Sequence, residues 1–381
     1  MTALGIGGVG LPQMPMVRYR PARNSSPDIH PLARDFETKL IRGDACAAAA
    51  VRMKRSGFSP DVIVVNPGWG EGLFLKDVWP AAKMLTLLEF FYAPRGLDAD
   101  FDPEFRIDDI AQDARVHIKN ASLLMALDSM DWGISPTHFQ HGVMPRAYRE
   151  RISVIFDGID TAVVCPDATA TMTLAGRTLR AGDEVLTFIN RNLEPYRGYH
   201  RFMRALPRIL RERPNAVVLI VGGDEVSYGA AAPAGTTWKQ KFFDDVKDRI
   251  DVSRVHFLGR IPYADYLKVL QVSACHVYLS YPFVLGWSCI EAMSAGCLVV
   301  GSATAPVQEV IAHQQNGLLV DFFDHDALAA AVTGALAQPA TYTHLRQAAR
   351  ETAVARYDLM THCLPRQMEL IDKLASGALH T

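Results

Sequence analysis

Short apolar runs rich in β-branched residues recur along this chain, and helical patterns separate them. Runs of this length are typical of strands that are buried on both faces of a sheet. Their alternation with helical segments predicts an α/β fold in which helices cover both faces of parallel sheets. The runs lie at 61–66, 84–90, 152–156, 185–190, 216–223, 254–259, 276–280, 298–302 and 317–320.

The length of the chain predicts two such domains. At 381 residues it exceeds one ordinary core and suits two domains of roughly 150 to 200 residues each. The segment 157–183 is rich in Asp, Thr, Gly and Pro and has no long periodic pattern, so it is the best candidate for the connection. We expect an N-terminal domain over 1–164, a C-terminal domain over 165–355, and a C-terminal helix over 356–381 that packs back on the body.

The first 27 residues are glycine-rich but do not form a dinucleotide-binding fingerprint. No apolar strand precedes "GIGGVG" and no clear helix follows it, and the fingerprint needs both. We therefore expect a loop. A doubly wound domain normally opens with a strand, so either a short strand lies within "MTALGI" or the first domain lacks its first strand–helix unit.

Composition excludes several classes of function. With 39 basic and 41 acidic residues there is no broad electrostatic footprint for nucleic acid. The six cysteines form no C-x-x-C pair and have no histidine at metal-ligand spacing, which is typical of reduced, cytosolic thiols. The longest apolar runs fall far short of the roughly 20 residues of a spanning helix. These patterns predict a cytoplasmic protein, at most peripheral to the inner face of the membrane.

One segment, "FVLGWSCIEAMSAG" at 283–296, places a single carboxylate, Glu291, in an apolar strand–turn–helix. Ser288 and Glu291 form the pattern S-x-x-E of a capping box in a first helical turn. Alternatively, the backbone amides of Gly286, Trp287 and Ser288 could bind an anion such as a phosphate. Glu291 would then accept hydrogen bonds from sugar hydroxyls beside that anion.

Other loops that follow strands carry residues suited to a phosphorylated ligand. Arg191 and Arg197 follow the run 185–190, and two guanidiniums at a strand end suit bidentate phosphate recognition, although solvated loop arginines give the same pattern. Gly222 and Gly223 end the run 216–223, where the backbone can approach a ligand or another strand closely. Backbone groups that could pair with a nucleobase follow the run 254–259, at Gly259, Arg260 and Ile261.

Taken together, these loops resemble the nucleotide-sugar-binding half of the family-4 retaining glycosyltransferases, which have the GT-B architecture of two facing Rossmann-like domains with a central cleft. The resemblance covers about 180–340 and is weaker over 60–165. The residues that match the pattern of the family, in order, are Arg191, Arg197, Gly198, Gly222, Gly223, Gly259, Arg260, Ile261, Glu291, Ala292, Met293, Ser294, Ala295 and Gly296.

The resemblance implies a role for each position. Arg191 and Arg197 would neutralise the donor diphosphate, the amides of 286–288 would hold the diphosphate or the sugar, and Glu291 would bind the ribose hydroxyls. Phe283 stands where the family usually has a glutamate that contacts the donor sugar, so the choice of sugar is in question. In the first domain, Glu89 replaces a usual histidine and could orient the acceptor, with a salt-bridged surface acid as the rival interpretation.

The resemblance implies a metal-independent transferase that moves a sugar from a nucleotide sugar to a glycan, lipid-linked or other acceptor in surface polysaccharide or glycoconjugate assembly. Attack on the front face, assisted by the leaving phosphate, requires no protein nucleophile. Two alternatives stay open: a sugar-phosphate synthase or nucleotide-sugar epimerase on the same fold, and a nucleotide- or carbohydrate-binding protein without turnover. Trp69, after the run 61–66, could stack on a sugar or pack against its own domain.

Overall fold

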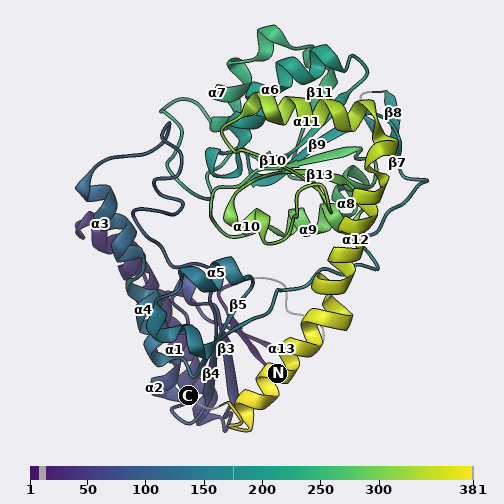
Figure 1. Ribbon diagram of the computed structural model, residues 1–381. Coiled ribbons are helices and arrows are strands. Elements are labelled where there is room, and N and C mark those ends of the chain that lie inside the picture. The colour runs from purple at the N-terminus through teal and green to yellow at the C-terminus, as the bar shows by residue number, and fades with distance from the viewer. Residues whose placement is uncertain (8–13, 175, 380–381) are drawn as a thin grey trace. The chain divides into compact units, whose positions relative to one another are not determined.

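The computed structural model describes residues 1–7, 14–174 and 176–379, and the chain forms two compact units (Figure 1). The first unit comprises Met1–Asp100, Arg106–Phe156 and Pro365–Thr381. The second comprises Phe101–Phe105 and Asp157–Leu364. No helix within the described ranges is both long and apolar enough to cross a membrane.

The first unit is built on a four-stranded parallel sheet in the order β3-β4-β5-β6. Its strands are β3 (Val62–Val65), β4 (Lys83–Leu87), β5 (Trp132–Ser135) and β6 (Ile152–Val154). Its helices are α1 (Arg34–Arg55), α2 (Leu75–Val78), α3 (Ile110–Lys119), α4 (Ala121–Ser129) and α5 (His138–Val143), with 3-10 turns at Pro31–Ala33, Pro67–Trp69 and Arg146–Arg151. The core behind β3 and β4 is formed by apolar side chains of α1 and α2.

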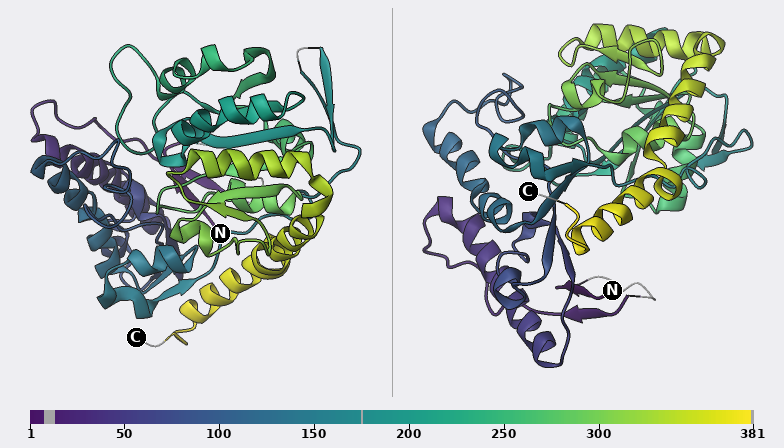
Figure 2. Two further views of the ribbon diagram at one scale, coloured as in Figure 1. Left: turned by 45° about the horizontal axis from the view of Figure 1, so that its top comes forward. Right: turned by 60° about the horizontal axis from the view of Figure 1, so that its bottom comes forward.

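Two short strands precede that sheet. β1 (Ala3–Gly5) pairs with β2 (Met16–Arg18) in parallel, and Figure 2 shows both in purple beside the N-terminus. The sequence predicted loop over this stretch, which is wrong for these two segments. A short strand does lie within "MTALGI". Half of "GIGGVG", residues 8–10, lies outside the described residues.

The C-terminal helix α13 (Leu364–Ala375) packs against the first unit. Leu370 and Leu374 are buried against Leu85 and Ile134 of the sheet and against Ile155, directly after β6. The chain therefore returns to the unit where it began. α12 (Thr343–Tyr357) and a π-helical turn at Leu359–Cys363 lead into it.

The second unit is built on a six-stranded parallel sheet in the order β11-β10-β9-β12-β13-β14. The strands are β9 (Val185–Asn192), β10 (Val217–Gly223), β11 (Val255–Gly259), β12 (Cys275–Tyr278), β13 (Leu298–Ser302) and β14 (Leu318–Val320). β10 and then β11 lie on one side of β9, and β12, β13 and β14 lie on its other side. This order creates a topological switch point between β9 and β12, which is where α/β sheets bind ligands.

Helices cover both faces of this sheet; α6 and α11 lie on one face, and α8 and α9 lie on the other (Figure 1). α6 shows why such a helix forms: Phe202, Leu206 and Ile209 recur at helical spacing and are buried. Phe202 stacks on Phe188 of β9 with ring centroids 4.5 Å apart. The helices are α6 (Tyr199–Glu212), α7 (Trp238–Asp244), α8 (Tyr263–Gln271), α9 (Trp287–Ser294), α10 (Ala305–Gln308) and α11 (His325–Ala337), with 3-10 turns at Pro195–Arg197, Lys247–Arg249, Val252–Arg254 and Pro339–Tyr342.

Each of the nine predicted runs overlaps a strand, but the connecting segment contains two short strands that no apolar run marked. The stretch 157–183, which has no long periodic pattern, contains an antiparallel hairpin of β7 (Thr171–Leu174) and β8 (Arg177–Arg180). The sequence analysis also missed β5, a central strand of the first sheet. Its four residues include Gly133, which weakens a strand pattern, so no apolar run marks it.

Candidate functional site

Four loops at the carboxyl edge of the second sheet bring the predicted residues to the same edge. Because all six strands are parallel, the loops after β9, β10, β11 and β12 leave the sheet on the same side. These loops hold residues 191–198, 222–229, 259–262 and 279–286. The loops after β9 and β12 flank the switch point, and they contact one another directly.

Arg197 joins these two loops. It is 8% exposed, and its Nη1 donates to Ser280 Oγ and to the Val284 carbonyl, each at 2.9 Å. Gly198 makes this approach possible, because it has a φ of +69° and a side chain there would overlap Leu279. Both bonds of Arg197 use Nη1, so within the described residues Nε and Nη2 are the donors that remain for a ligand.

Two aromatic rings hold the Arg197 guanidinium. Its Cζ lies 5.3 Å from the centroid of the Tyr228 ring and 5.7 Å from that of Phe283, within cation–π range. Phe283 is 3% exposed, and its ring centroid lies 4.8 Å from that of Tyr228. The residue that replaces the usual glutamate of the family therefore packs against a predicted phosphate-binding arginine. Sequence reasoning did not find Tyr228, which lies in a loop without a motif.

Glu194 is a second residue of this site that the sequence analysis missed. Its carboxylate is buried and accepts the backbone amides of Ser227 and Tyr228, the latter at 3.0 Å. Burial raises the pKa of Glu194 to about 7, although these hydrogen bonds and the charges of Arg197 and Arg191 act in the opposite direction. Its position between the two arginines, in "RNLEPYR", was the available signal.

Arg191 differs from Arg197 in its surroundings. It belongs to the end of β9, its side chain is exposed, and it makes no hydrogen bond or ion pair with any residue in the described ranges. An exposed cation beside a switch point can turn toward an anion at little cost in desolvation.

The glycines that end β10 make room for side chains. A Cβ on Gly223 would lie 2.6 Å from Asn192 Oδ1 and 2.8 Å from Arg260 Nε. Arg260 Nη2 in turn donates to Asn192 Oδ1 at 3.1 Å and to Glu225 at 2.5 Å. The pair Gly222 and Gly223 is thus required at least for packing. Whether it also faces a ligand stays a prediction, as it does for Gly259 and Ile261.

The amino end of α9 does not have the capping box that the sequence suggested. The helix begins at Trp287 with Gly286 as its N-cap, no side chain caps it, and Glu291 lies beyond the first turn. That interpretation is wrong because the box needs its serine one residue before the helix, and Ser288 is the second helical residue. The Gly286 amide donates to the Tyr278 hydroxyl at 2.7 Å, whereas no described group accepts from the amides of Trp287 and Ser288.

The side chain of Trp287 is itself held in place. It is 55% exposed, yet its indole Nε1 donates to Asp157 at 2.9 Å. Burial raises the pKa of that carboxyl group, and the hydrogen bond from the indole opposes the shift. The first residue of α9 is therefore tied to the start of the connecting segment.

Glu291 has two partners that the sequence analysis did not foresee. The carboxylate is 7% exposed, and it accepts the hydroxyl of Tyr263 at 2.9 Å and that of Tyr266 at 2.5 Å, one on each oxygen. Both tyrosines lie in the first turn of α8, directly after Gly259–Arg260–Ile261. Burial and the charge of Glu291 raise the pKa of both tyrosines, so they remain donors. A carboxylate oxygen can accept more than one hydrogen bond, so capacity remains for a ligand.

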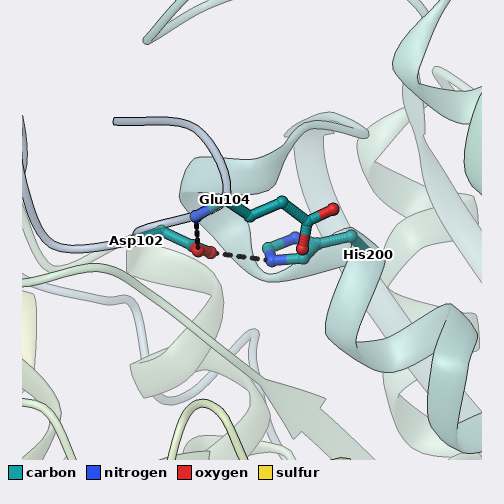
Figure 3. Close-up of side chains that lie close together, drawn as sticks. All are labelled: Asp102, Glu104 and His200. Carbon is teal, nitrogen blue, oxygen red and sulfur yellow. Dashed lines mark hydrogen bonds and ion pairs between the residues drawn. The ribbon is translucent and has the colours of Figure 1, made fainter. Parts of the chain in front are cut away.

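An acid–histidine cluster lies elsewhere in the second unit, where the buried Asp102 and the exposed Glu104 approach the buried His200 of α6 (Figure 3). Among the described residues this is the only group whose spacing would suit a metal ion. Its ligand atoms already have partners, because His200 Nε2 lies 2.9 Å from Asp102 and Arg204 binds both oxygens of Glu104. Arg201 adds a further positive charge. The positive charges of Arg201 and Arg204 therefore disfavour the binding of a metal cation.

In the first unit, the predicted residue Glu89 lies two positions beyond β4, with an exposed side chain. Its carbonyl accepts the side-chain amide of Gln140 at 2.8 Å. Trp69 is 61% exposed, and the guanidinium of Arg42 lies 5.2 Å from its ring centroid. Both residues therefore lie at the carboxyl edge of their own sheet, in the loops after β4 and β3.

Comparison with known families accounts for this arrangement. The model of the glycosyl transferase family 4 group matches residues 5–164, and the model of glycosyl transferases group 1 matches residues 175–352. The chain belongs to the family-4 retaining glycosyltransferases. The resemblance that was weak before residue 165 thus extends over most of the chain.

Individual relatives of this glycosyltransferase are distant. The glycogen synthase of Mycobacterium tuberculosis is 27% identical over 210 residues, which is 55% of this chain and 46% of that enzyme. The chain therefore spans about half the length of this curated relative. Among solved structures, a sucrose-phosphate synthase from Thermosynechococcus elongatus aligns with a TM-score of 0.72 at 21% identity, over 97% of this chain and 85% of its own.

Another solved structure with a similar fold contains a nucleotide sugar. The structure of HepE from Anabaena in complex with UDP-glucose aligns with a TM-score of 0.62 at 16% identity, over 94% of this chain and 86% of its own. Likeness at such low identity is evidence for the fold. The architecture of this chain therefore consists of two parallel sheets, and its structural neighbours are of the GT-B type.

Proposed function

We propose that this protein transfers a sugar from a nucleotide-sugar donor, and that the donor binds at the carboxyl edge of the second sheet. The observation that carries the proposal is the buried Arg197, which is held by two aromatic rings and two hydrogen bonds at the switch point. A guanidinium fixed in this way is preorganised for an anion and loses little entropy when one binds.

The diphosphate is the group that we assign to this position. Arg191 supplies an exposed charge, Arg197 supplies Nε and Nη2, and the amides of Trp287 and Ser288 point from a helix N-terminus. The Gly286 amide bonds to Tyr278, so it takes part only if that bond opens.

The nucleoside follows from the same geometry. We assign the ribose hydroxyls to the remaining acceptor capacity of Glu291, with Tyr263 and Tyr266 holding its carboxylate in place. The backbone of Gly259, Arg260 and Ile261, directly before those tyrosines, is assigned to the base. UDP-glucose, which HepE binds, is the first donor to test.

The chemistry is displacement of the nucleoside diphosphate by an acceptor hydroxyl. Negative charge develops on the leaving phosphate, and the two arginines stabilise it without a metal. Front-face attack assisted by that phosphate needs no protein nucleophile. Glu89 is assigned to the acceptor hydroxyl, because a carboxylate at the end of β4 can orient it or accept its proton.

The acceptor that we propose is a glycan or a lipid-linked saccharide, in the assembly of a surface polysaccharide or glycoconjugate in the cytoplasm or at its membrane. This part of the proposal rests on the family alone.

The test measures binding and release of the nucleotide in the full-length protein. Titration calorimetry with UDP, GDP, ADP and their glucose conjugates identifies the base, and a coupled assay for the free diphosphate detects turnover. Arg191→Gln should lower the rate of diphosphate release by about a hundredfold, because it removes one donor to the developing charge.

A matched control is Arg211→Gln, which removes an exposed arginine near the other end of α6 and should leave the rate unchanged. Full activity of Arg191→Gln would contradict the role of Arg191. Tight binding of a nucleotide with no release in any acceptor mixture would instead favour a binding protein without turnover.

A further inference from the structure

A cavity of about 670 Å³ lies in the first unit, and none of the residues assigned to the donor is among those that line it. This volume falls within the range of about 300–1,000 Å³ that is usual for small-molecule sites. Its walls are the loop 21–27 that follows β2, the first two turns of α1, and Ile6 beyond β1. It therefore lies at the carboxyl edge of β1 and β2, where parallel strands bind ligands.

The lining of this cavity is basic. Arg23, Arg34 and Arg42 contribute to it, and none of the described residues that line it is acidic. Arg34, Thr38, Ile41 and Arg42 follow the spacing i, i+4, i+7 and i+8, which places them on one face of α1. A single helical face thus presents two guanidiniums and a hydroxyl to the cavity.

The charges of these arginines are unequally compensated. Arg23 pairs with Glu37 at 2.8 Å, but Arg34 makes no side-chain hydrogen bond or ion pair with any described residue. Arg42 lies over the ring of Trp69, which orients a guanidinium without neutralising it. Two like charges that line one cavity raise its potential and favour an anion.

The wall opposite the helix is already fixed. Ser25 Oγ lies 2.6 Å from Thr38 Oγ1, and the Ser26 amide donates to Glu37 at 2.9 Å. With the Arg23–Glu37 pair, three contacts therefore hold the loop against the first turns of α1. A cavity shaped in this way is preorganised, so an occupant would not have to order the loop.

We propose that this cavity binds a phosphate group carried by the acceptor substrate. A phosphate offers three strong acceptor oxygens and close to two charges, which matches two or three guanidiniums better than a single carboxylate does. That this phosphate belongs to the acceptor rests on the proposed function, because a transferase whose donor binds the second unit needs another site for its second substrate. The phosphate assignment rests on the cavity alone.

Arginine modification tests first whether the cavity binds phosphate, separately from whether that phosphate belongs to the acceptor. The full-length protein is modified with the arginine reagent phenylglyoxal, with and without inorganic phosphate, and modified peptides are measured by mass spectrometry. Phosphate should slow the modification of Arg34 and Arg42 but not that of Arg52, an exposed arginine on the same helix. Equal protection of all three, or of none, would overturn the proposal.

Variants test the same point by affinity. The double variant Arg34→Gln, Arg42→Gln should bind phosphate at least about tenfold more weakly, as expected for lost charge-assisted hydrogen bonds. Arg52→Gln should bind it normally. Nucleotide binding should be unchanged in both variants. If the native protein itself bound no nucleotide, the donor site would be refuted and the cavity result would still stand.

Two further probes distinguish the sources of the phosphate. One is glucose 6-phosphate with glucose as control, and the other is a phosphatidylcholine vesicle carrying a polyprenyl phosphate, with the plain vesicle as control. Protection of Arg34 and Arg42 by either phosphorylated probe supports the proposal and identifies the acceptor as soluble or lipid-linked. Protection by inorganic phosphate alone would overturn the assignment to an acceptor.

Discussion

At the scale of single residues, the site depends on side chains that hold other side chains in place. Arg197 is positioned by Tyr228 and Phe283, and Tyr228 is positioned by the buried carboxyl group of Glu194. Gly198 allows the whole approach. The strained or buried positions thus lie next to the residues that we assign to the ligand.

Glu194 gives a prediction about pH. Burial raises its pKa from 4.5 to about 7, so the folded chain binds this proton more tightly than the unfolded chain. The resulting stability is complete below pH 4.5 and is lost as the pH rises through 7. Between pH 4.5 and 7 the free energy of unfolding of the native protein should fall by up to about 3 kcal/mol. The Glu194→Gln variant should not show this fall.

Chemical unfolding of both proteins at pH 4.5 and 7.5 checks this difference. Glu351→Gln, on an exposed face of α12, is the control and should follow the native protein. A native protein and a Glu194→Gln variant with the same pH dependence would contradict the buried, protonated state.

Sequence alone found part of this site. Arg191 and Arg197 were noticed because they follow an apolar run, and Glu291 because it is the single carboxylate in an apolar segment; their assignment to a ligand stays a prediction. Their partners were missed for a physical reason: Tyr263, Tyr266 and Tyr228 come from separate loops, and only the folded sheet brings them to one edge. The suggested capping box shows the opposite error, because a local pattern was present but the helix begins one residue before Ser288.

At the scale of elements, the segment Phe101–Phe105 joins the second unit although the chain on both sides belongs to the first. Asp102 anchors it, accepting from His200, Arg201 and Tyr281. Burial acts to raise the pKa of Asp102, but the interaction with His200, the hydrogen bond from the Glu104 amide and the charge of Arg201 lower it to about 2. Burial lowers the pKa of His200, so the histidine is a neutral donor and Arg201 carries the compensating charge.

Asp102→Asn should therefore be costly. It leaves Arg201 without its buried counter-charge, and breaking such a pair costs about 3 kcal/mol. Glu104→Gln is the matched control: its partner Arg204 is partly exposed, so the loss should stay below about 1 kcal/mol. Thermal unfolding measures both, and equal stability of the two variants would contradict the anchoring role.

Strands were easier to predict from the sequence than the long-range contacts between segments. The nine apolar runs mark strands because burial on both faces leaves them continuously apolar, whereas β5 is short and contains glycine. Nothing in the sequence around Phe101–Phe105 indicates the second unit, since the contacts of Asp102 are 98 to 179 residues away along the chain. Long-range contacts of this kind arise from the fold and leave no local pattern.

At the scale of the whole molecule, we propose that the two units bind different substrates. The second unit binds the donor nucleotide, and the first binds a phosphorylated acceptor. The family fits this division, because its two models meet between residues 164 and 175. The donor assignment is the central claim, because the chemistry follows from it.

Hydrogen exchange of the full-length protein with and without UDP-glucose tests that claim most directly. The account predicts slower exchange at 191–198, 223–228, 259–263 and 283–291, with the amides of Trp287 and Ser288 protected because a diphosphate would accept from them. The Gly286 amide, already bonded to Tyr278, should change least. Binding of the nucleotide with no change in these segments, or with changes confined to the first unit, would contradict the account.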